Sequence, residues 1–546
     1  MKKLIAILLC MCVCLSSFLG CAGDTNVYDA DGNVITDQSK ILDINVWNSG
    51  YGINWINALA NQFKKDNPGT GITIQADDKS GNFQRTAQLD SASANSIDLY
   101  FNYAPDYQKP EYIKNLEPLN DIINAPAATG ETMTIGEKFG DATMSALGGT
   151  KNAQGKYEGV AAYNGNLYVL NYGSGSNGIV YNARLFDACD IEVPKTTNEF
   201  KSLVAVIKDN ISYNDIDGVN LTGKYPLYNY PGYWTNVIVA WWLQYEGAEN
   251  YSKFFSFDGI SNPLTEDMNR FNQDGMKYAL QALKEIITPA GISSPKSTET
   301  ENYMANLRDF IDLETAFMYP CGSFFETEYT KNPQANISRL NNFKIMRYPV
   351  ISNLAEKLSK ADARDSDLSA LVDYVDKIAD GQSATKPAWA TDADVELVYN
   401  ARFASTGAPT KSTVCIPNYS PSKELAKKFL QYMYSDAGMK VFAEAQHSFL
   451  SVEFDNDTLK NSINTSSWTA FAKSALELSK VRVSVPQDMS HPVYALEKFN
   501  DMNVFRPNSV PETLLLGGTS VETILAGEWS NFKSEWETNL YSQYFN

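Results

Sequence analysis

The sequence predicts an α/β protein with two lobes, each built on a mixed, mostly parallel sheet flanked by helices. The chain has 546 residues, whereas a single domain usually takes roughly 100–200. Strand patterns alternate with helix patterns from residue 41 onward, and the alternation returns after residue 178. Such alternation is typical of a parallel sheet with helices on its faces.

The first structural unit begins at residue 41. Residues 41–47 alternate apolar and polar side chains, which predicts a strand. Trp55, Leu59 and Phe63 then recur at helical spacing, and the Asn-Pro-Gly sequence at 67–69 ends that helix. Ligands bind beyond the carboxyl ends of parallel strands, so the residues that follow these strands are candidate contacts.

Further elements follow the same logic along the chain. We expect strands at 72–75, 97–102, 178–181, 316–319 and 343–348, helices at 85–93, 183–188 and 354–379, a loop at 380–386, and an amphipathic helix pair at 423–445 around Gly438.

The first 21 residues predict export from the cytoplasm. Lys2 and Lys3 precede an apolar run of about 16 residues, shorter than the roughly 20 of a membrane-spanning helix, and Gly20 stands before Cys21. This ending resembles the lipobox of bacterial lipoproteins, in which the signal is cleaved before the cysteine and the sulfur is lipidated, although Phe18 replaces the usual Leu. The alternative is an ordinary cleaved signal. We expect a signal peptide at 1–20, lipid on Cys21 and a flexible tether at 21–40.

The charge of the chain argues against two classes of partner. The formal net charge is −19, and it becomes −21 once the two lysines of the leader are removed. A surface this acidic repels nucleic acid and anionic lipid headgroups, so contact with the membrane is expected through the anchor alone. Beyond the leader and Cys21, only Cys189, Cys321 and Cys415 remain, which predicts buried free thiols and no disulfide framework.

Patterns for catalysis and for cofactors are weak. The two histidines, His447 and His491, lack metal-ligand spacing, and no G-x-S-x-G sequence is present. The glycines of 173–178 precede a strand, which is the wrong context for a dinucleotide site. An acidic loop around Asp29 lacks the terminal ligands of a calcium site, so we predict no metal and no cofactor. A pair of catalytic carboxylates stays open, because any two of many acidic residues could meet in space.

Aromatic residues give the clearest indication of a ligand-binding site in this sequence. They make up 12% of the chain and cluster at 225–245. Trp241, Trp242 and Tyr245 fit a buried helical stripe, whereas Tyr233 and Trp234 open the helix, where a cleft could reach them. Aromatic faces suit the C–H faces of sugars, and neighbouring polar tips can satisfy hydroxyl groups.

Several segments in order resemble the extracellular solute-binding proteins of ABC importers, the group that includes maltose-binding protein. They are the strand, helix and strand at 42–74, the strand at 96–101, the stretches at 178–196 and 314–324, and the late helices at 416–438. The resemblance implies the two-lobe fold of type II periplasmic binding proteins, with a ligand cleft between the lobes. It implies an N-terminal lobe of 41–160 and 350–448, and a C-terminal lobe of 161–349 and 449–546. Hinge crossings are expected near 161–163, 348–349 and 449–452.

The resemblance also carries ligand contacts to matching positions. These are Tyr51, Asn102, Tyr103, Asp106, Tyr163, Asn164, Tyr233, Trp234 and Phe324. Phe325 is a further candidate, because Phe324 and Phe325 end a strand after Gly322, where a cleft could lie. Phe324 stands where the family has a stacking Trp, and Tyr51-Gly52 replaces the charged contacts usual after the first strand. Both departures argue against a maltose-like ligand. A loop at 214–218 that resembles a calcium site in longer members has Tyr213 in place of the first ligand, so no metal is predicted there either.

The sequence and this resemblance therefore predict a non-enzymatic, monomeric lipoprotein that captures a neutral carbohydrate, expected to be an oligosaccharide, and passes it to a membrane permease. Closure of the lobes around the ligand would be the working step. Two alternatives stay open: a secreted glycoside hydrolase with a pair of carboxylates, and a surface adhesin that holds polysaccharide without a transporter.

Overall fold

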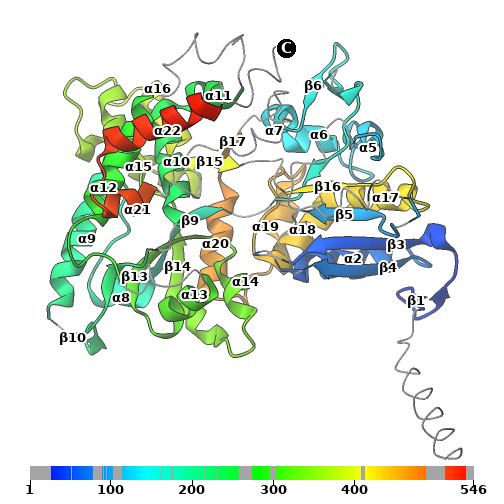
Figure 1. Ribbon diagram of the computed structural model, residues 1–546, viewed down its shortest axis with the longest axis horizontal. Helices are drawn as coiled ribbons and strands as arrows, with labels where there is room; N and C mark the ends of the chain where they lie inside the picture. Colours follow the sequence, from blue (N-terminus) through cyan, green and yellow to red (C-terminus); the bar gives the residue numbers. More distant parts are fainter. Residues whose placement is uncertain are drawn as a thin grey trace, which may run out of the picture.

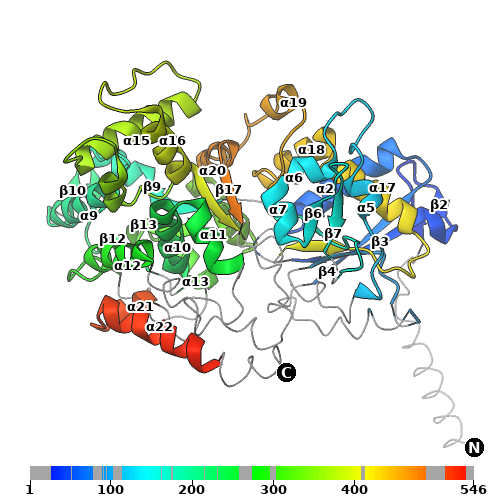
Figure 2. The same cartoon turned by 90° about the horizontal axis from the view of Figure 1, so that it is seen from above.

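The two predicted lobes lie side by side in the computed structural model (Figure 1), and the view from above separates them in the same way (Figure 2). The structure describes residues 26–48, 50, 52–77, 89, 92–93, 95–102, 113–160, 163–173, 176–213, 215–229, 232–256, 273–294, 303–407, 412–486 and 511–535. The leader, Cys21 and the expected helix at 85–93 lie outside these residues or are described only at single positions. None of the described helices is both long and apolar enough to cross a membrane.

The first lobe is built on a five-stranded sheet of order β4-β3-β5-β16-β8. Its strands are β3 (Ile41–Trp47), β4 (Gly71–Asp77), β5 (Leu99–Asn102), β8 (Leu170–Asn171) and β16 (Thr413–Cys415). The β3 strand pairs in parallel with β4 and β5, whereas β16 runs antiparallel to β5 and β8. The expected strand–helix–strand opening is thus confirmed, and the late segment of the chain returns to complete its sheet.

Helices of the first lobe bury their apolar stripes on this sheet. They are α2 (Asn54–Asp66), α5 (Asn120–Ile123), α6 (Ile135–Phe139), α7 (Asp141–Ala146), α17 (Lys423–Tyr434) and α18 (Asp436–Gln446). Trp55 of α2 is 1% exposed, and its ring lies 5.2–5.6 Å from the rings of Phe101, Tyr172 and Phe442. These contacts join α2, the sheet and α18 in one core. Two hairpins complete the lobe: β1 (Val27–Tyr28) with β2 (Val34–Ile35), and β6 (Gly149–Lys151) with β7 (Tyr157–Gly159).

The second lobe has a four-stranded sheet of order β12-β13-β9-β14. Its strands are β9 (Asn177–Asn182), β12 (Tyr225–Leu227), β13 (Ala316–Gly322) and β14 (Phe343–Met346). Only the pair β12–β13 is parallel, because β9 runs antiparallel to both β13 and β14. The second sheet is therefore mixed, and the expectation of mostly parallel pairing is wrong for this lobe.

Helices cover both faces of the second sheet. They are α8 (Ala183–Ala188), α9 (Thr197–Ile211), α10 (Tyr233–Glu246), α11 (Ala248–Ser256), α12 (Asp274–Ile287), α13 (Tyr303–Asp312), α14 (Phe325–Thr330), α15 (Asp365–Ala379), α16 (Asp392–Phe403), α20 (Ala470–Lys480), α21 (Pro511–Leu516) and α22 (Val521–Glu535). Neighbouring residues of β9 show the two faces, since Ile179 packs in the cluster of α9, α10 and α12, whereas Val180 packs with α13 and α20. A sheet covered on both faces needs apolar side chains on both, which explains the fully buried β13. The small hairpin of β10 (Asp215–Ile216) and β11 (Val219–Asn220) also belongs to this part of the chain.

Over the residues that the structure describes, the chain passes between the two cores three times. Tyr172 belongs to the first core and Ile179 to the second; Phe403 belongs to the second and Val414 to the first. Val452 packs in the first core, and α20 then packs in the second after the short helix α19 (Asp457–Asn461). Strand β15 (Ala404–Gly407) lies at the second passage and pairs in parallel with β17 (Val483–Pro486).

The packing differs from the expected division of the chain over residues 350–403. Leu354, Leu371 and Val398 pack in the same core as β9 and α10, so this segment belongs to the second lobe. The second crossing accordingly falls at 403–414 and not near 348–349, and the first falls at 172–179 and not near 161–163. The apolar spacing of α15 predicts a helix but does not say which core it joins, and α16 was not predicted from the sequence.

A substitution at Gly438 tests how α17 and α18 pack against each other. A Cβ on Gly438 would lie 1.9 Å from the carbonyl oxygen of Tyr432, so the break between α17 and α18, which falls at Ser435, leaves no room for a side chain. We expect Gly438→Ala to lower the free energy of unfolding by about 2–3 kcal/mol in urea titrations. Gly527→Ala, in α22 with no atom within 4 Å of the new Cβ, should instead raise it by about 0.5–1 kcal/mol. Equal effects of the two changes would contradict this packing.

Candidate functional site

The two lobes contact each other where the chain leaves β3. Lys331 Nζ, just after α14, donates a hydrogen bond of 3.2 Å to the carbonyl oxygen of Asn48. A Cβ on Gly50 would lie 3.0 Å from Glu328 Oε1 and 3.4 Å from Phe324 Cβ, and a Cβ on Gly52 would lie 3.0 Å from Thr327 Cγ2. The β3–α2 loop therefore lies directly against the N-terminal half of α14, and we call this contact the lobe junction.

Two half-buried aromatic rings border the lobe junction. Phe324 precedes α14 and Tyr233 begins α10, and their ring centroids are 6.4 Å apart at 62°. The ring of Tyr233 also lies 5.7 Å from that of Tyr319 in β13. Phe324 thus lies beside the loop that follows β3, which is where parallel sheets bind ligands, and Tyr233 from a distant segment packs next to Phe324.

Glu328 is the unusual group at the lobe junction. Its side chain is in contact distance of Gly50, the residue is 7% exposed, and Oε2 has no hydrogen-bond partner among the described residues. Burial raises the pKa of this carboxyl to about 7, against a smaller lowering by Lys331. A buried carboxyl without a partner is costly, so a ligand that offers a donor here would be bound favourably.

A second carboxyl repeats this arrangement at the start of α10. Glu512 is 2% exposed, its Oε1 accepts the N–H of Gly232, and its Oε2 has no hydrogen-bond partner within the part of the chain that the structure describes. Burial raises the pKa of Glu512 to about 7. Gly232 directly precedes Tyr233, so the residue next to Tyr233 in the chain binds the Glu512 carboxyl. Phe324 has a similar neighbour, because Phe324 and Glu328 both lie against Gly50.

His447 forms another link between the lobes. It ends α18 of the first lobe, and its Nδ1 lies 3.3 Å from Glu326 Oε1 of α14. Glu326 Oε2 also accepts a 2.5 Å hydrogen bond from the Thr469 hydroxyl, and the His447 ring packs against Trp468 with centroids 4.2 Å apart at 34°. The acceptors of Glu326 are thus occupied, in contrast to those of Glu328.

The sequence-predicted contacts divide into four groups, the last of which consists of core residues. Tyr51, Tyr103 and Asp106 lie outside the described residues, and Asn102 is described only in its backbone, at the end of β5. Tyr233 and Phe324 border the lobe junction as described above. The structure also places Tyr163 and Asn164 on the loop between β7 and β8, where neither forms a described contact with α14.

Two of the expected contacts are core residues. Trp234 is 0% exposed, donates from Nε1 to Asn229 Oδ1 at 2.7 Å and stacks with Phe200. Phe325 is also 0% exposed and packs with the rings of Phe343 and Phe471. The expectation that these two rings contact ligand is therefore wrong for this arrangement, because helical periodicity turns both side chains inward. Tyr163 packs on Gly148, and burial raises its pKa to about 12.

Sequence reasoning missed Glu328, although a signal was present. Glu326 and Glu328 follow directly on the Gly-Ser-Phe-Phe stretch that resembles the ligand-contacting segment of the family. Polar residues on the first turn after that stretch were natural candidates. Which of the two carboxylates would be unpaired depends on Thr469 and His447, which come from distant parts of the chain.

A hollow lies on the first lobe, lined by residues other than those of the lobe junction. It has a volume of about 830 Å³ between the end of α2, the 126–131 loop and α17, and Tyr432 packs against Phe63 in its wall. It is large enough for an oligosaccharide, but its other lining groups are mainly polar and backbone groups of a single lobe. The described residues contain no group of three or more side chains that could hold a metal ion. Cys321 and Cys415 are buried and Cys189 is half-buried; all three are free, and burial raises the pKa of each thiol.

Solved structures with the same fold are numerous, but their sequences are distant. The chain matches no protein-family model and no curated protein. It is similar to a probable secreted solute-binding lipoprotein from Streptomyces coelicolor, with a TM-score of 0.54 at 12% identity, over 91% of this chain and 99% of that one. A chitin oligosaccharide binding protein gives 0.52 at 14% identity over 90% and 98%, and the sugar-binding protein MalE from Xanthomonas citri gives 0.51 at 13% over 91% and 98%. These likenesses show the fold of type II periplasmic binding proteins.

The ionisation of Glu328 gives a test of the lobe junction. Because burial raises its pKa from 4.5 to about 7, the folded chain holds a proton that the unfolded chain has lost, and stability falls as the pH rises through this window. We expect Glu328→Gln to raise the free energy of unfolding at pH 8 by up to about 3 kcal/mol, with the gain disappearing below pH 5. Urea titrations at both pH values measure this.

The matched control for this test is Glu424→Gln, an exposed carboxylate of α17. It should leave the pH profile of the wild type unchanged. Parallel profiles for Glu328→Gln and the wild type would mean that Glu328 is not a buried, unpaired carboxyl.

Proposed function

We propose that this chain is the lipid-anchored solute-binding component of an ABC importer, which captures a carbohydrate between its lobes as a monomer and delivers it to the permease. The lobe junction supports this most directly, because Phe324 of the second lobe lies against the loop that follows β3 of the first, and the half-buried ring of Tyr233 lies 6.4 Å from the Phe324 ring. The fold adds support, since two similar proteins are named for binding chitin oligosaccharide and sugar.

The chemistry of the lobe junction suits a ligand with many hydroxyl groups. The faces of Tyr233 and Phe324 can pack against the C–H faces of a sugar ring, and Glu328 can accept from a hydroxyl. Because the β3–α2 loop and α14 contact each other, residues of both lobes would surround a ligand bound beside them. A ligand that bridges the lobes favours their closed arrangement, and the closed form is what the permease would recognise.

The anchor completes the proposal. Lipid on Cys21 and a flexible segment before residue 41 would hold the binding lobes close to the permease, at high effective concentration. The leader and Cys21 lie outside the described residues, so this part rests on the sequence alone. Mass spectrometry of the membrane fraction, with Cys21→Ala as the comparison, tests it.

One observation favours a glycoside hydrolase as a second candidate. A carboxyl with its pKa raised to about 7, as in Glu328, is typical of a general acid at neutral pH. Such an enzyme needs a second carboxylate across the scissile bond, and the neighbouring Glu326 is engaged by Thr469 and His447. Recovery of an intact glycan after long incubation supports binding, whereas cleavage products would identify the enzyme.

Binding itself is tested by calorimetry with oligosaccharides chosen from a thermal-shift screen. We expect a one-to-one complex, and Phe324→Ala should weaken binding by about 1–3 kcal/mol because it removes a ring that packs on the ligand. Tyr432→Phe provides the matched control: it changes an aromatic residue of the hollow on the first lobe, and should leave the affinity unchanged. If Tyr432→Phe weakens binding and folded Phe324→Ala does not, the ligand site lies in that hollow and not at the lobe junction.

A further inference from the structure

The chain that precedes the first sheet is folded onto the first lobe. Strands β1 and β2 pair in antiparallel register, with Val27 opposite Ile35 and Tyr28 opposite Val34. A Cβ on Gly71, the first residue of β4, would lie 2.4 Å from Val27 Cγ1 and 3.6 Å from Ile35 Cγ1. One face of the hairpin therefore packs directly on the start of β4.

Hydrogen bonds hold this segment at its turn and at its far end. Asp29, 9% exposed, accepts the N–H of Asn33 at 2.8 Å and the side-chain amide of Asn33 at 3.1 Å. Farther along, the Ser422 hydroxyl, just before α17, donates to the carbonyl oxygens of Gln38 and Ile41 at 2.8 and 2.7 Å. A segment fixed in this way presents a defined surface, which a free linker would not.

The other face of the hairpin is apolar and exposed. Tyr28 is 38% exposed and Val34 is 49% exposed. Because side chains alternate between the two faces of a strand, this pair lies on the face opposite to Val27 and Ile35. Tyrosine is typical of the boundary between lipid and water, since its ring is apolar and its hydroxyl is polar. The outer face of the hairpin thus suits a lipid surface.

The length of the chain places this face beside the membrane, if Cys21 carries lipid as in the proposed function. Because the hairpin is docked, the linker between lipid and lobe shortens from the expected 21–40 to residues 22–25. Each residue extends the chain by at most about 3.6 Å, so Asn26 lies within about 18 Å of a lipidated Cys21. The Tyr28–Val34 face is therefore within reach of the lipid headgroups.

The charges near the hairpin indicate the kind of lipid surface that it fits. Asp31 and Asp37 are exposed, and Lys40 is the exposed cation that follows them. The chain as a whole has a net charge of −19, so anionic headgroups repel it. The matching partner is a bilayer surface with electrically neutral headgroups, into which an apolar pair can partition.

We propose that the β1–β2 hairpin seats the first lobe on the membrane, with its Tyr28–Val34 face in the neutral headgroup region beside Cys21. This inference rests on the lipid anchor of the proposed function. The lipid supplies most of the affinity. The hairpin orients the lobe, because a weak second contact next to an anchor acts at high effective concentration.

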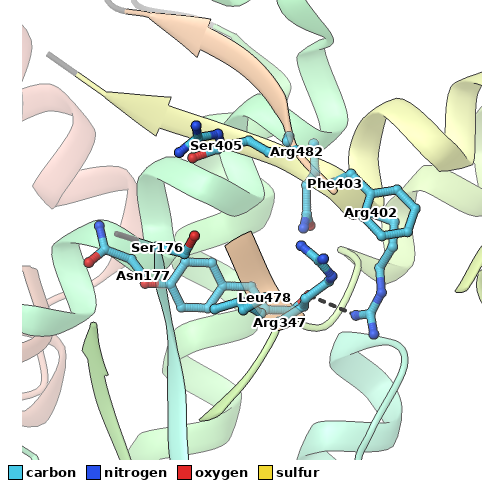
Figure 3. A pocket seen from close by; sticks show the side chains of 11 residues that line it. Ser176, Asn177, Arg347, Arg402, Phe403, Ser405, Leu478 and Arg482 are labelled. Atoms are coloured by element: carbon cyan, nitrogen blue, oxygen red, sulfur yellow. Dashed lines mark hydrogen bonds between the residues drawn. The ribbon is translucent and has the colours of Figure 1, made fainter. Parts of the chain in front are cut away.

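A contact at this position leaves the lobe junction and the passages between the lobes free. The hairpin packs at the start of β4, whereas the lobe junction lies beyond the carboxyl end of β3, its parallel neighbour. Figures 1 and 2 place the hairpin at the outer end of the first lobe, away from the second lobe. Figure 3 shows Ser405 and Arg482, from two of the passages, beside a cavity of about 30 Å³ whose described lining residues all lie at or after residue 176. The second lobe can therefore move while the first is held at the membrane.

Quenching by labelled lipid tests this contact in the full-length, lipidated protein. The protein carries Cys189→Ser and a fluorophore on Thr36→Cys, an exposed position just after β2, and is reconstituted in phosphatidylcholine vesicles that contain a lipid with a nitroxide on its headgroup. We expect quenching at least about twofold stronger there than for the same fluorophore on Val206→Cys, an exposed position of α9 in the second lobe. Anionic phosphatidylglycerol in the vesicles should weaken the quenching.

Substitutions on the hairpin separate a surface contact from mere tethering. Tyr28→Ser together with Val34→Ser should lower the quenching at least about twofold, because apolar surface is lost from the contact. The matched pair Tyr213→Ser and Leu313→Ser, at exposed positions of the second lobe, should leave it unchanged. Melting temperatures of the soluble Cys21→Ala forms show whether each variant folds, and Val34→Ser alone replaces the double variant if that one does not.

The outcomes separate this inference from the rest of the proposed function. Lipid on Cys21, found by mass spectrometry, with the same quenching before and after the hairpin substitutions would overturn the inference and leave the anchor intact. Absence of lipid on Cys21 would overturn the anchor and the inference together, without bearing on carbohydrate capture. Quenching that increases with phosphatidylglycerol would overturn the neutral lipid surface.

Discussion

The contact between the β3–α2 loop and α14 is the interaction on which the arrangement of this molecule depends. Gly50 and Gly52 allow the loop to approach α14, and a side chain at either position would meet Glu328 or Thr327 at 3.0 Å. The contact buries a carboxyl that has an oxygen without a partner. Closing the lobes therefore carries an electrostatic cost that packing alone has to offset.

This cost gives a physical reason for closure to depend on a ligand. If the lobes separate, Glu328 regains water and the cost disappears. If a ligand hydroxyl donates to Glu328 while the rings of Tyr233 and Phe324 cover the sugar, the closed form is stabilised relative to the open one. A ligand shifts such an equilibrium only by its difference in affinity for the two forms, and an unpaired carboxyl at the lobe junction is a direct source of that difference. The lobes themselves can stay rigid, because each has its own core and, over the described residues, three short segments pass between them.

The sequence predicts the elements of this fold well and their assembly less well. The strand at 41–47 and the helix at 183–188 are found with those limits, because alternation and helical spacing are local properties. The membership of 350–403 in the second lobe could not be predicted, since the apolar stripe of α15 is equally compatible with either core. The antiparallel pairing of β9 with β13 and β14 depends on contacts between segments more than 100 residues apart.

The candidate site shows the same limit at the level of side chains. Tyr233 and Phe324 were predicted from a resemblance and lie at the lobe junction, whereas their direct neighbours Trp234 and Phe325 are in the core. One residue along a helix turns a side chain by about 100°, so a motif cannot say which of two adjacent rings faces outward. Glu328 was missed because its importance comes from missing partners, which only a three-dimensional arrangement reveals.

The most direct test of the central claim is the distance between the lobes with and without a carbohydrate ligand. Spin labels on Lys65→Cys in α2 and Val206→Cys in α9 occupy exposed positions of opposite lobes, and Cys189→Ser removes the half-buried native thiol. Pulsed electron resonance should give a broad distribution of longer distances for the ligand-free protein and a narrow one of shorter distances at saturating ligand. Identical distributions in the two states would contradict a role in which the lobes close around the ligand.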